Sequence, residues 1–197
     1  SFIILMTVSG GAAVSLEAEC ENNDEKVEES LLSYFPAYVN MVYDFAGEGI
    51  EFASFNRKIY FTKAEGTYIQ THQDNGGTET VSLYKRESGQ ILLLYQESEF
   101  YQKTNLLEQI EEKKAAEPLI ILKAPLQQGK KWETRGQVRE IIGVDQTITT
   151  PCGTFHKVIE VKIENIKSES TFITYEYYAP NIGLIFRKSI SKKGYII

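Results

Sequence analysis

Apolar and polar residues alternate along much of this chain, and this pattern is the strongest constraint on its fold. In the first half the alternation is clearest in four runs: residues 39–45, 58–62, 67–71 and 80–84. Period-two alternation is typical of β-strands that bury one face. Glycine, which adopts the positive φ of tight hairpin turns, separates the runs within residues 47–49, 75–77 and 88–89. The sequence therefore predicts antiparallel hairpins.

The second half of the chain shows the same alternation. Its predicted strands are residues 132–142, 146–149, 155–163, 172–178 and 184–190. One helix is expected between the halves, within residues 98–116, because Leu106, Leu107 and Ile110 form a short apolar stripe that precedes Pro118. Residues 28–33 have the pattern of one further helical turn.

Three short motifs occur twice in the same order. Residues 36–51 match 125–140, residues 66–68 match 153–155, and residues 84–91 match 178–185, with offsets of 89, 87 and 94. The offsets differ only by amounts that a loop can absorb. We interpret the matches as an internal duplication with units at residues 35–95 and 124–190; chance recurrence of common turn residues is the alternative.

These elements predict a mainly β fold. We expect two duplicated antiparallel meanders, joined by a short helix and closed into a curved half-barrel, barrel or sandwich. A chain of 197 residues is the size of one domain, which we place at residues 34–197 after an acidic linker at 21–33. A strongly curved sheet with an apolar concave face is one way to hold a lipid-like ligand.

Residues 2–14 are apolar and carry no charge. They are too few to span a bilayer as a helix, but they match the hydrophobic region of a secretory signal. Residues 1–20 are therefore interpreted as a signal-like segment, with an N-terminal arm of the folded domain as the alternative. Cleavage after Ala18 and lipid modification of Cys20 are both open, although Glu19 departs from the usual lipoprotein pattern. Cleavage after Ala18 predicts a secreted protein, and modification of Cys20 predicts a lipid-anchored one.

The chain has two cysteines, Cys20 and Cys152, which are too few for a disulfide framework. Outside the cell, a bridge between them would tie the N-terminal segment to the body of the protein. A buried, unpaired Cys152 is the alternative. Cys20 is thus a candidate for lipidation or a disulfide, and Cys152 for a disulfide.

Charge and motifs exclude several function classes. A net charge of −6 argues against general attraction to nucleic acid, and a membrane partner is expected only through a lipid anchor. Gly47-Glu48-Gly49 lacks the third glycine and the following helix of a phosphate-binding loop. We therefore expect no nucleotide and no other cofactor.

The residues that could carry chemistry have simpler interpretations. Cys152 and His156 are four residues apart near a predicted turn, with no second pair to complete a metal site. His72 lies beside a polar hairpin tip and is expected to be solvated. Glu97 and Glu99 resemble paired acids, but surface carboxylates are common in an acidic chain. The aromatic residues Tyr175, Tyr177 and Tyr178 are expected to pack in the core or across strands. We predict no catalytic site, no metal site and no enzyme activity.

Three stretches resemble an uncharacterised family of secreted proteins and lipoproteins of Gram-positive bacteria. They are PLQQGKKWE at 125–133, TITTPCGTFHKVIEVKIE at 147–164 and TYEYYAPNIGLIFR at 174–187, which contain the family's TP-x-GTF and YYAPxxGLI motifs. Residues 34–55 resemble the companion segment of those proteins. The resemblance implies a β-rich domain of the cell envelope without an assigned reaction. The chain departs from the pattern at Cys152, where alanine is usual, and before Cys20.

We interpret the motif residues as structural. Gly153 is expected to set a turn, Trp132 and Phe155 to fill the core, and Pro180 and Gly183 to shape the bend that follows Tyr178. The expected function is a non-catalytic envelope protein, binding or structural, whose partner is an envelope protein, a cell-wall component or a hydrophobic small molecule. A carrier or sensor of a hydrophobic ligand is the alternative, and a hydrolase the third choice. An apolar cavity would favour the carrier, and convergent polar groups the enzyme.

Overall fold

The computed structural model describes residues 31–49, 53–87, 89–166 and 172–191. Within these residues, strands form two antiparallel sheets. Sheet A contains β1 (Val42–Phe45), β2 (Phe55–Lys63), β3 (Tyr68–Asp74), β4 (Glu79–Glu87), β5 (Gln90–Ser98) and β6 (Leu119–Lys123). Sheet B contains β7 (Lys131–Thr134), β8 (Gln137–Thr150), β9 (Gly153–Asn165), β10 (Phe172–Ala179) and β11 (Gly183–Ser191).

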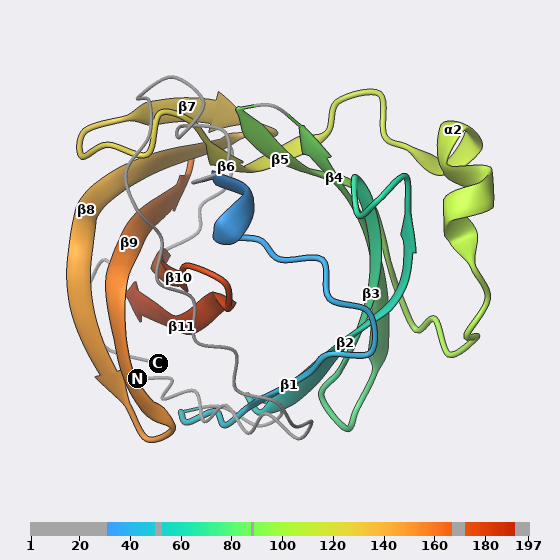
Figure 1. Ribbon diagram of the computed structural model, residues 1–197, viewed down its shortest axis with the longest axis horizontal. Helices are drawn as coiled ribbons and strands as arrows, with labels where there is room; N and C mark the ends of the chain where they lie inside the picture. Colours follow the sequence, from blue (N-terminus) through green and yellow to red (C-terminus); the bar gives the residue numbers. More distant parts are fainter. Residues whose placement is uncertain (1–30, 50–52, 88, 167–171, 192–197) are drawn as a thin grey trace.

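Each sheet is a meander in which every strand pairs with its neighbour in the chain. Sheet A is curled into a half-barrel, and sheet B curves opposite it to enclose a shared interior (Figure 1). The prediction of a mainly β fold made of two antiparallel meanders and a short helix is confirmed.

The helix between the sheets is shorter than predicted. It consists of η1 (Leu106–Gln109) and α2 (Ile110–Lys113), and it begins after Asn105, whose side chain accepts a hydrogen bond from the Leu107 backbone N–H. The predicted stripe is confirmed, because Leu106, Leu107 and Ile110 are buried. Together, residues 99–118 form a connector that covers the outer face of sheet A (Figure 1).

Two further boundaries differ from the sequence analysis. The strand predicted at residues 132–142 is broken by a two-residue turn, where Arg135 and Gly136 have φ of 44° and 75°. Positive φ at both central residues is the requirement of a tight hairpin turn. The separate strand predicted at residues 146–149 belongs to β8, which continues past Gly143 through register shifts.

The buried apolar side chains form two clusters. The larger lies between the sheets and includes Ile69 and Tyr84 from sheet A, and Trp132, Ile159 and Ile185 from sheet B. The smaller lies between the outer face of sheet A and the connector, where the apolar stripe of the helix meets β4 and β5. Sheet A is therefore covered on both faces, and its strands bury side chains on each of them.

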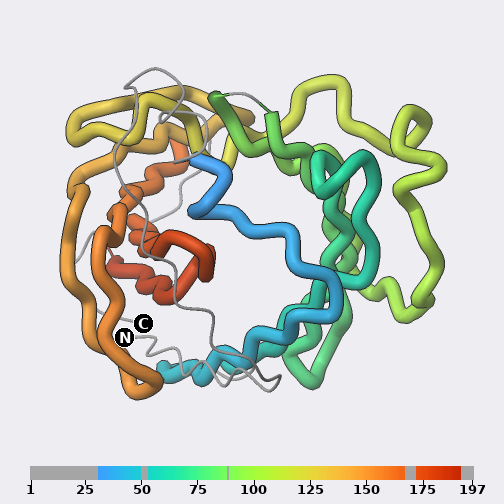
Figure 2. Tube along the Cα trace, viewed as in Figure 1, coloured from blue at the N-terminus to red at the C-terminus, as the bar shows by residue number. Residues whose placement is uncertain are grey.

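Residues 31–41 form a strap that runs between the two sheets (Figure 2). It starts with a helical turn at residues 31–33, and Leu31, within the predicted acidic linker, is fully buried. The Tyr34 hydroxyl donates a hydrogen bond to the Lys157 carbonyl at 2.5 Å, and the Asn181 N–H donates to the Ser33 carbonyl at 2.7 Å. The signal-like segment, Cys20 and most of the linker lie outside the described residues.

The repeated motifs occupy equivalent places in the two meanders. Tyr43 lies on the first strand of sheet A and pairs with Arg57, and Trp132 lies on the first strand of sheet B and pairs with Arg139. Gly89 directly precedes the fifth strand of sheet A, and Gly183 is the first residue of the fifth strand of sheet B. This agreement is what a duplication would produce, and the superposition of residues 35–95 on 124–190 stays a prediction.

None of the helices in the described part of the chain is long and apolar enough to cross a bilayer.

Candidate functional site

A polar cavity of about 250 Å³ lies on the outer face of sheet A, at the edge of the connector. We call it the His72 cavity. Its walls come from β1, β2, β3, β4 and the connector: Val42, Asn56, Lys58, Tyr60, His72, Asp74, Glu79 and Lys103. Alternate residues of a strand share a face, so Lys58 and Tyr60 of β2 lie beside His72 and Asp74 of β3.

His72 is not the solvated turn residue that the sequence predicted. Its side chain is 2% exposed, because β3 continues to Asp74 and the turn lies beyond it. The ring is covered by Tyr60 and by Phe100 of the connector, with ring centroids 4.7 and 5.9 Å away. The tertiary fold therefore buries a histidine that local sequence places at a polar hairpin.

The hydrogen bonds around His72 determine its tautomer. The Leu106 backbone N–H donates to Gln70 Oε1 at 2.8 Å, which orients the Gln70 amide so that its Nε2 faces His72 Nε2 at 3.0 Å. Nε2 of His72 therefore accepts, and Nδ1 carries the proton and donates it to Glu79 Oε1 at 2.6 Å. Gln70 Nε2 also donates to the Thr104 carbonyl at 2.8 Å. Both nitrogens of His72 are thus bonded to side chains of sheet A, and these two side chains, Gln70 and Glu79, in turn bond to the connector.

Charge gathers at the open side of the cavity. Lys103 makes an ion pair with Glu79, and Lys58 and Lys103 lie 4.8 and 5.1 Å from the centroid of the Tyr60 ring. Burial, together with the positive charge of Lys103, lowers the pKa of His72 to about 4. Burial and the nearby Lys58 lower the pKa of Lys103, although Asp74 opposes them. The cavity therefore presents ammonium groups and carboxylates beside a neutral imidazole.

We expect His72→Ala to lower the free energy of unfolding by about 1–3 kcal/mol, because it removes two buried hydrogen bonds, one to Gln70 and one to Glu79. The effect should be largest at neutral pH. Unfolded histidine takes up a proton near pH 6.5 and His72 only near pH 4, so this part of the stability is lost as the pH falls between those values.

Urea unfolding at pH 7 and pH 4.5 would measure both effects. His156→Ala is the matched control, because His156 is exposed and contacts only the Thr147 hydroxyl in the described structure, at 3.1 Å. That variant should change stability by less than about 0.5 kcal/mol. Equal effects of the two substitutions would contradict the role assigned to His72.

A second charged cluster lies between the sheets, around Glu176 of β10. Its carboxylate accepts from Arg187 Nη2 at 2.7 Å and from the Tyr178 hydroxyl at 2.6 Å, and lies 3.4 Å from Arg139 Nη1. Arg139 also donates to the Ile121 carbonyl of β6 at 3.0 Å, which joins the two sheets. Burial by itself would raise the pKa of Glu176, but the two arginines and Tyr178 outweigh it and lower the pKa to about 2. Protein groups bond to both oxygens of the Glu176 carboxylate, so we interpret the cluster as structural.

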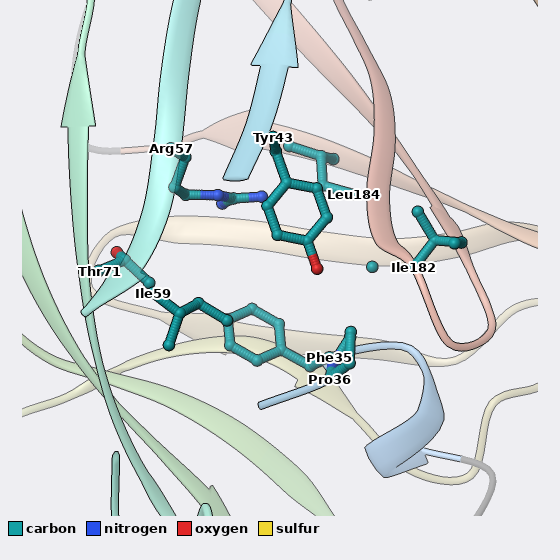
Figure 3. Close-up of a pocket in the computed structure, with 9 residues that line it drawn as sticks. Phe35, Pro36, Tyr43, Arg57, Ile59, Thr71, Ile182 and Leu184 are labelled. Atoms are coloured by element: carbon teal, nitrogen blue, oxygen red, sulfur yellow. The ribbon is translucent and has the colours of Figure 1, made fainter. Parts of the chain in front are cut away.

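An apolar pocket between the sheets is lined by the strap, by β1 to β3 and by the β10–β11 turn (Figure 3). Phe35 and Pro36 of the strap lie across from Tyr43 and Ile182, and Arg57 extends along the Tyr43 ring. The pocket has a volume of about 20 Å³, which is room for roughly one water molecule. With the strap in place, it cannot hold the acyl chain that the carrier hypothesis requires.

The motif residues lie at turns and in the core. Trp132 and Tyr178 are 5% and 3% exposed, and Phe155 is half-buried against the same apolar cluster. The turn glycines Gly153 and Gly183 have φ of 147° and 92°. A Cβ atom on Gly183 would lie 3.4 Å from Pro36 Cδ, an ordinary contact, so the positive φ rather than the strap is what favours glycine here. The half-buried Pro180 is the first residue of the β10–β11 turn.

The structure gives no support to the catalytic pairs considered from sequence. Cys152 is exposed at the β8–β9 turn, not buried, with its Sγ 3.0 Å from the Thr150 hydroxyl, whereas His156 contacts a different threonine. Glu97 accepts a hydrogen bond from Tyr95, and Glu99 lies beyond the end of β5. Among the described residues no group of three or more His, Cys, Asp or Glu side chains is placed to hold a metal ion.

No protein-family model and no curated protein matches the chain. Among solved structures it is similar to a presumed lipoprotein from Parabacteroides distasonis, with 15% identity, a TM-score of 0.47, and coverage of 84% of this chain and 94% of that one. It is also similar to a presumed exported protein with a YmcC-like fold from Bacteroides fragilis, with 13% identity, a TM-score of 0.40, and coverage of 73% and 82%. Both similarities are too weak to transfer a fold or a function to this chain.

Proposed function

We propose that this chain is a non-catalytic protein of the bacterial cell envelope that binds a small dipolar ligand in the His72 cavity. The observation that carries the proposal is the arrangement of charge around one cavity of about 250 Å³. Lys58 can pair with an acidic group of a ligand and Asp74 with a basic one, beside the ion pair that Lys103 and Glu79 already form. Tyr60 supplies an aromatic surface between the two lysines.

The state of His72 favours binding over catalysis. A general base needs a free nitrogen and a pKa near the working pH. His72 has both nitrogens hydrogen-bonded and a pKa of about 4. Its role in the proposal is to keep the cavity wall rigid.

The chemistry of the cavity fits a fragment of the cell wall. Cell-wall peptides carry free carboxylates and amino groups on the same short chain, which matches the alternation of lysines and acids in the cavity. The signal-like residues 2–14 and the resemblance to secreted and lipid-anchored proteins support a location where such a peptide is within reach.

A titration of the 15N-labelled protein with purified muropeptides would test the proposal. We expect chemical-shift changes at Tyr60, His72 and Lys103, and Lys58→Ala should weaken binding by about fivefold to tenfold through loss of a charge-assisted hydrogen bond. Lys63→Ala is the matched control, because Lys63 lies on the same strand but pairs with Glu108. Equal weakening by both substitutions would mean that binding depends only on the net charge of the protein. Cleavage of the muropeptide would show that the protein is an enzyme.

A separate measurement concerns attachment to the membrane. In the native host, Cys20→Ala should abolish incorporation of labelled palmitate and release the protein into the medium, because only the cysteine after a signal segment receives the lipid. Cys152→Ala should keep both the label and the membrane fraction, since Cys152 is at a hairpin turn of the folded domain. Retention of label by the Cys20 variant would contradict lipid anchoring at that residue.

A further inference from the structure

Arg86 of β4 lies in the wall of a second cavity, of about 380 Å³, at the opposite face of sheet A from the connector. The cavity is formed where the strap, the β2–β3 turn and the β10–β11 turn meet. We call it the Arg86 pocket. It is lined by Leu32, Ser33, Pro36, Ala37, Tyr38, Glu65, Arg86 and Asn181.

The guanidinium of Arg86 is only partly satisfied by the protein. Its Nη1 donates to the Gly66 carbonyl at 3.2 Å and its Nη2 to the Leu32 carbonyl at 3.3 Å. Nε is buried and has no hydrogen-bond partner among the residues that the structure describes. A guanidinium has five N–H donors, so these two bonds leave donors unused.

Arg86 also has no counter-ion in the described part of the chain. Within the described ranges, no carboxylate lies within ion-pair distance of it, whereas Arg139 and Arg187 both reach Glu176. Burial lowers the pKa of Arg86, and only the Tyr38 hydroxyl opposes this. A half-buried charge without a partner is unfavourable, and a bound anion is the usual compensation.

The backbone leaves room for this arginine. A Cβ atom on Gly66 would lie 3.1 Å from Arg86 Nη1 and 2.9 Å from Ala37 Cβ, and φ at this glycine is 83°. Glycine at this turn therefore lets the strap and the guanidinium approach each other. The same Gly-Thr motif recurs at Gly153, where a Cβ atom would meet nothing.

The other walls of the pocket are largely apolar. Leu32, Pro36 and Ala37 of the strap face the cavity, and the Tyr38 side chain at its rim is 50% exposed. Among the described residues of the lining Glu65 is the one carboxylate, and it makes no ion pair with Arg86. The pocket thus combines a cationic group, an apolar wall and a single acidic group that would disfavour an anion.

We propose that the Arg86 pocket binds a small organic anion, whose carboxylate or phosphate pairs with Arg86 and whose apolar part packs against Pro36 and Tyr38. A planar guanidinium can bind either oxyanion through two N–H groups. This site is separate from the His72 cavity and does not depend on the function proposed for it.

The test uses the full chain and four simple probes: acetate, hexanoate, hexyl phosphate and hexylamine. The Nε–Hε resonance of Arg86 and the ring resonances of Tyr38 report on binding. We expect both to shift with hexanoate and hexyl phosphate, and hexanoate to bind at least about tenfold more tightly than acetate, because its chain buries additional methylene groups. Hexylamine, with the same chain and the opposite charge, should cause no shift at these groups.

Three variants make the result specific. Arg86→Gln should abolish the response to hexanoate, and Arg135→Gln, which removes an exposed arginine from the turn after β7, should leave it unchanged. Glu65→Gln should tighten hexanoate binding several-fold, because it removes the acidic group from the lining. Glu65 is exposed, so this variant decides the question even if Arg86→Gln does not fold.

The opposite results overturn the proposal. Unchanged hexanoate binding in folded Arg86→Gln would place the anion elsewhere. Weaker or unchanged binding in Glu65→Gln, or an equal response to hexylamine, would show that the pocket does not recognise an anion. Stronger binding of hexyl phosphate than of hexanoate would identify phosphate esters as the ligand class, and the reverse order would identify carboxylic acids.

Discussion

Replacing Trp132 by alanine is expected to lower the free energy of unfolding by about 3–5 kcal/mol, the effect of truncating a fully buried aromatic side chain. Trp132 lies where the two sheets meet. Its ring is 5% exposed, and its Nε1 donates a hydrogen bond to the Ile120 carbonyl of β6 at 3.0 Å. The neighbouring Thr134 hydroxyl accepts from the Ile120 N–H at 2.8 Å. Loss of the indole would leave a cavity at this junction and free the Ile120 carbonyl.

Urea unfolding measures the loss. Trp132→Phe keeps most of the packing and removes the hydrogen bond, so it should reduce stability by only about 1–3 kcal/mol. Tyr101→Ala is the control for removing an aromatic ring, since Tyr101 is 62% exposed, and it should have almost no effect. A loss below about 1 kcal/mol for Trp132→Ala would mean that the junction does not depend on the indole.

Glu176→Gln is the second substitution with a large expected effect, about 3–5 kcal/mol of destabilisation at pH 7. The amide cannot neutralise Arg139, whose side chain is 5% exposed and whose charge would be left buried without a partner. Arg187 is 41% exposed on its side chain, so water can compensate it in part.

The same carboxylate predicts the acid limit of the fold. The pKa of Glu176 is lowered from 4.5 to about 2, so its ionised form stabilises the folded state. This contribution, about 3 kcal/mol, is complete above pH 4.5 and is lost as the pH falls toward 2.

Urea unfolding between pH 5 and pH 2 would measure this slope. Glu176→Gln should remove most of it, whereas Glu133→Gln, at an exposed position on β7, should retain it. The same slope in both variants would assign the acid sensitivity to other carboxylates.

The strands that the sequence analysis found and missed differ in how they are buried. β2, β3 and β4 include the alternating runs from which they were predicted, because alternation records one buried and one more polar face. β5 and β6 contain continuous apolar runs at residues 91–95 and 119–122 and were not predicted. In β5 the run is explained by two partners, since Ile91 and Leu93 join the cluster between the sheets while Leu92 and Leu94 meet the connector. A run without a period cannot be assigned to a strand from local sequence.

The candidate sites are harder to predict from the sequence than the strands. The sequence predicts a solvated His72, whereas the structure buries it. Gln70, which orients His72, carries no recognisable signal in the sequence. The sequence does not predict a role for Arg86, because one arginine on a strand cannot be distinguished from a surface charge until its neighbours are known. The motif residues are different, since Trp132, Gly153 and Gly183 act through local turns or bulk and could be recognised individually.

The chain's own order of residues determines which side chains share a face of each strand and where the hairpins turn, because both follow from backbone geometry over a few residues. Only the tertiary structure decides which of those faces is covered. Gln70 and His72 lie on a face that local pattern marks as polar, and they are buried because the connector folds back over it through contacts up to 36 residues away. Arg86 faces the interior and has no counter-ion among the described residues, because the strap that covers it brings carbonyl groups and apolar side chains. Burial and charge pairing depend on segments distant in sequence, which no local pattern contains.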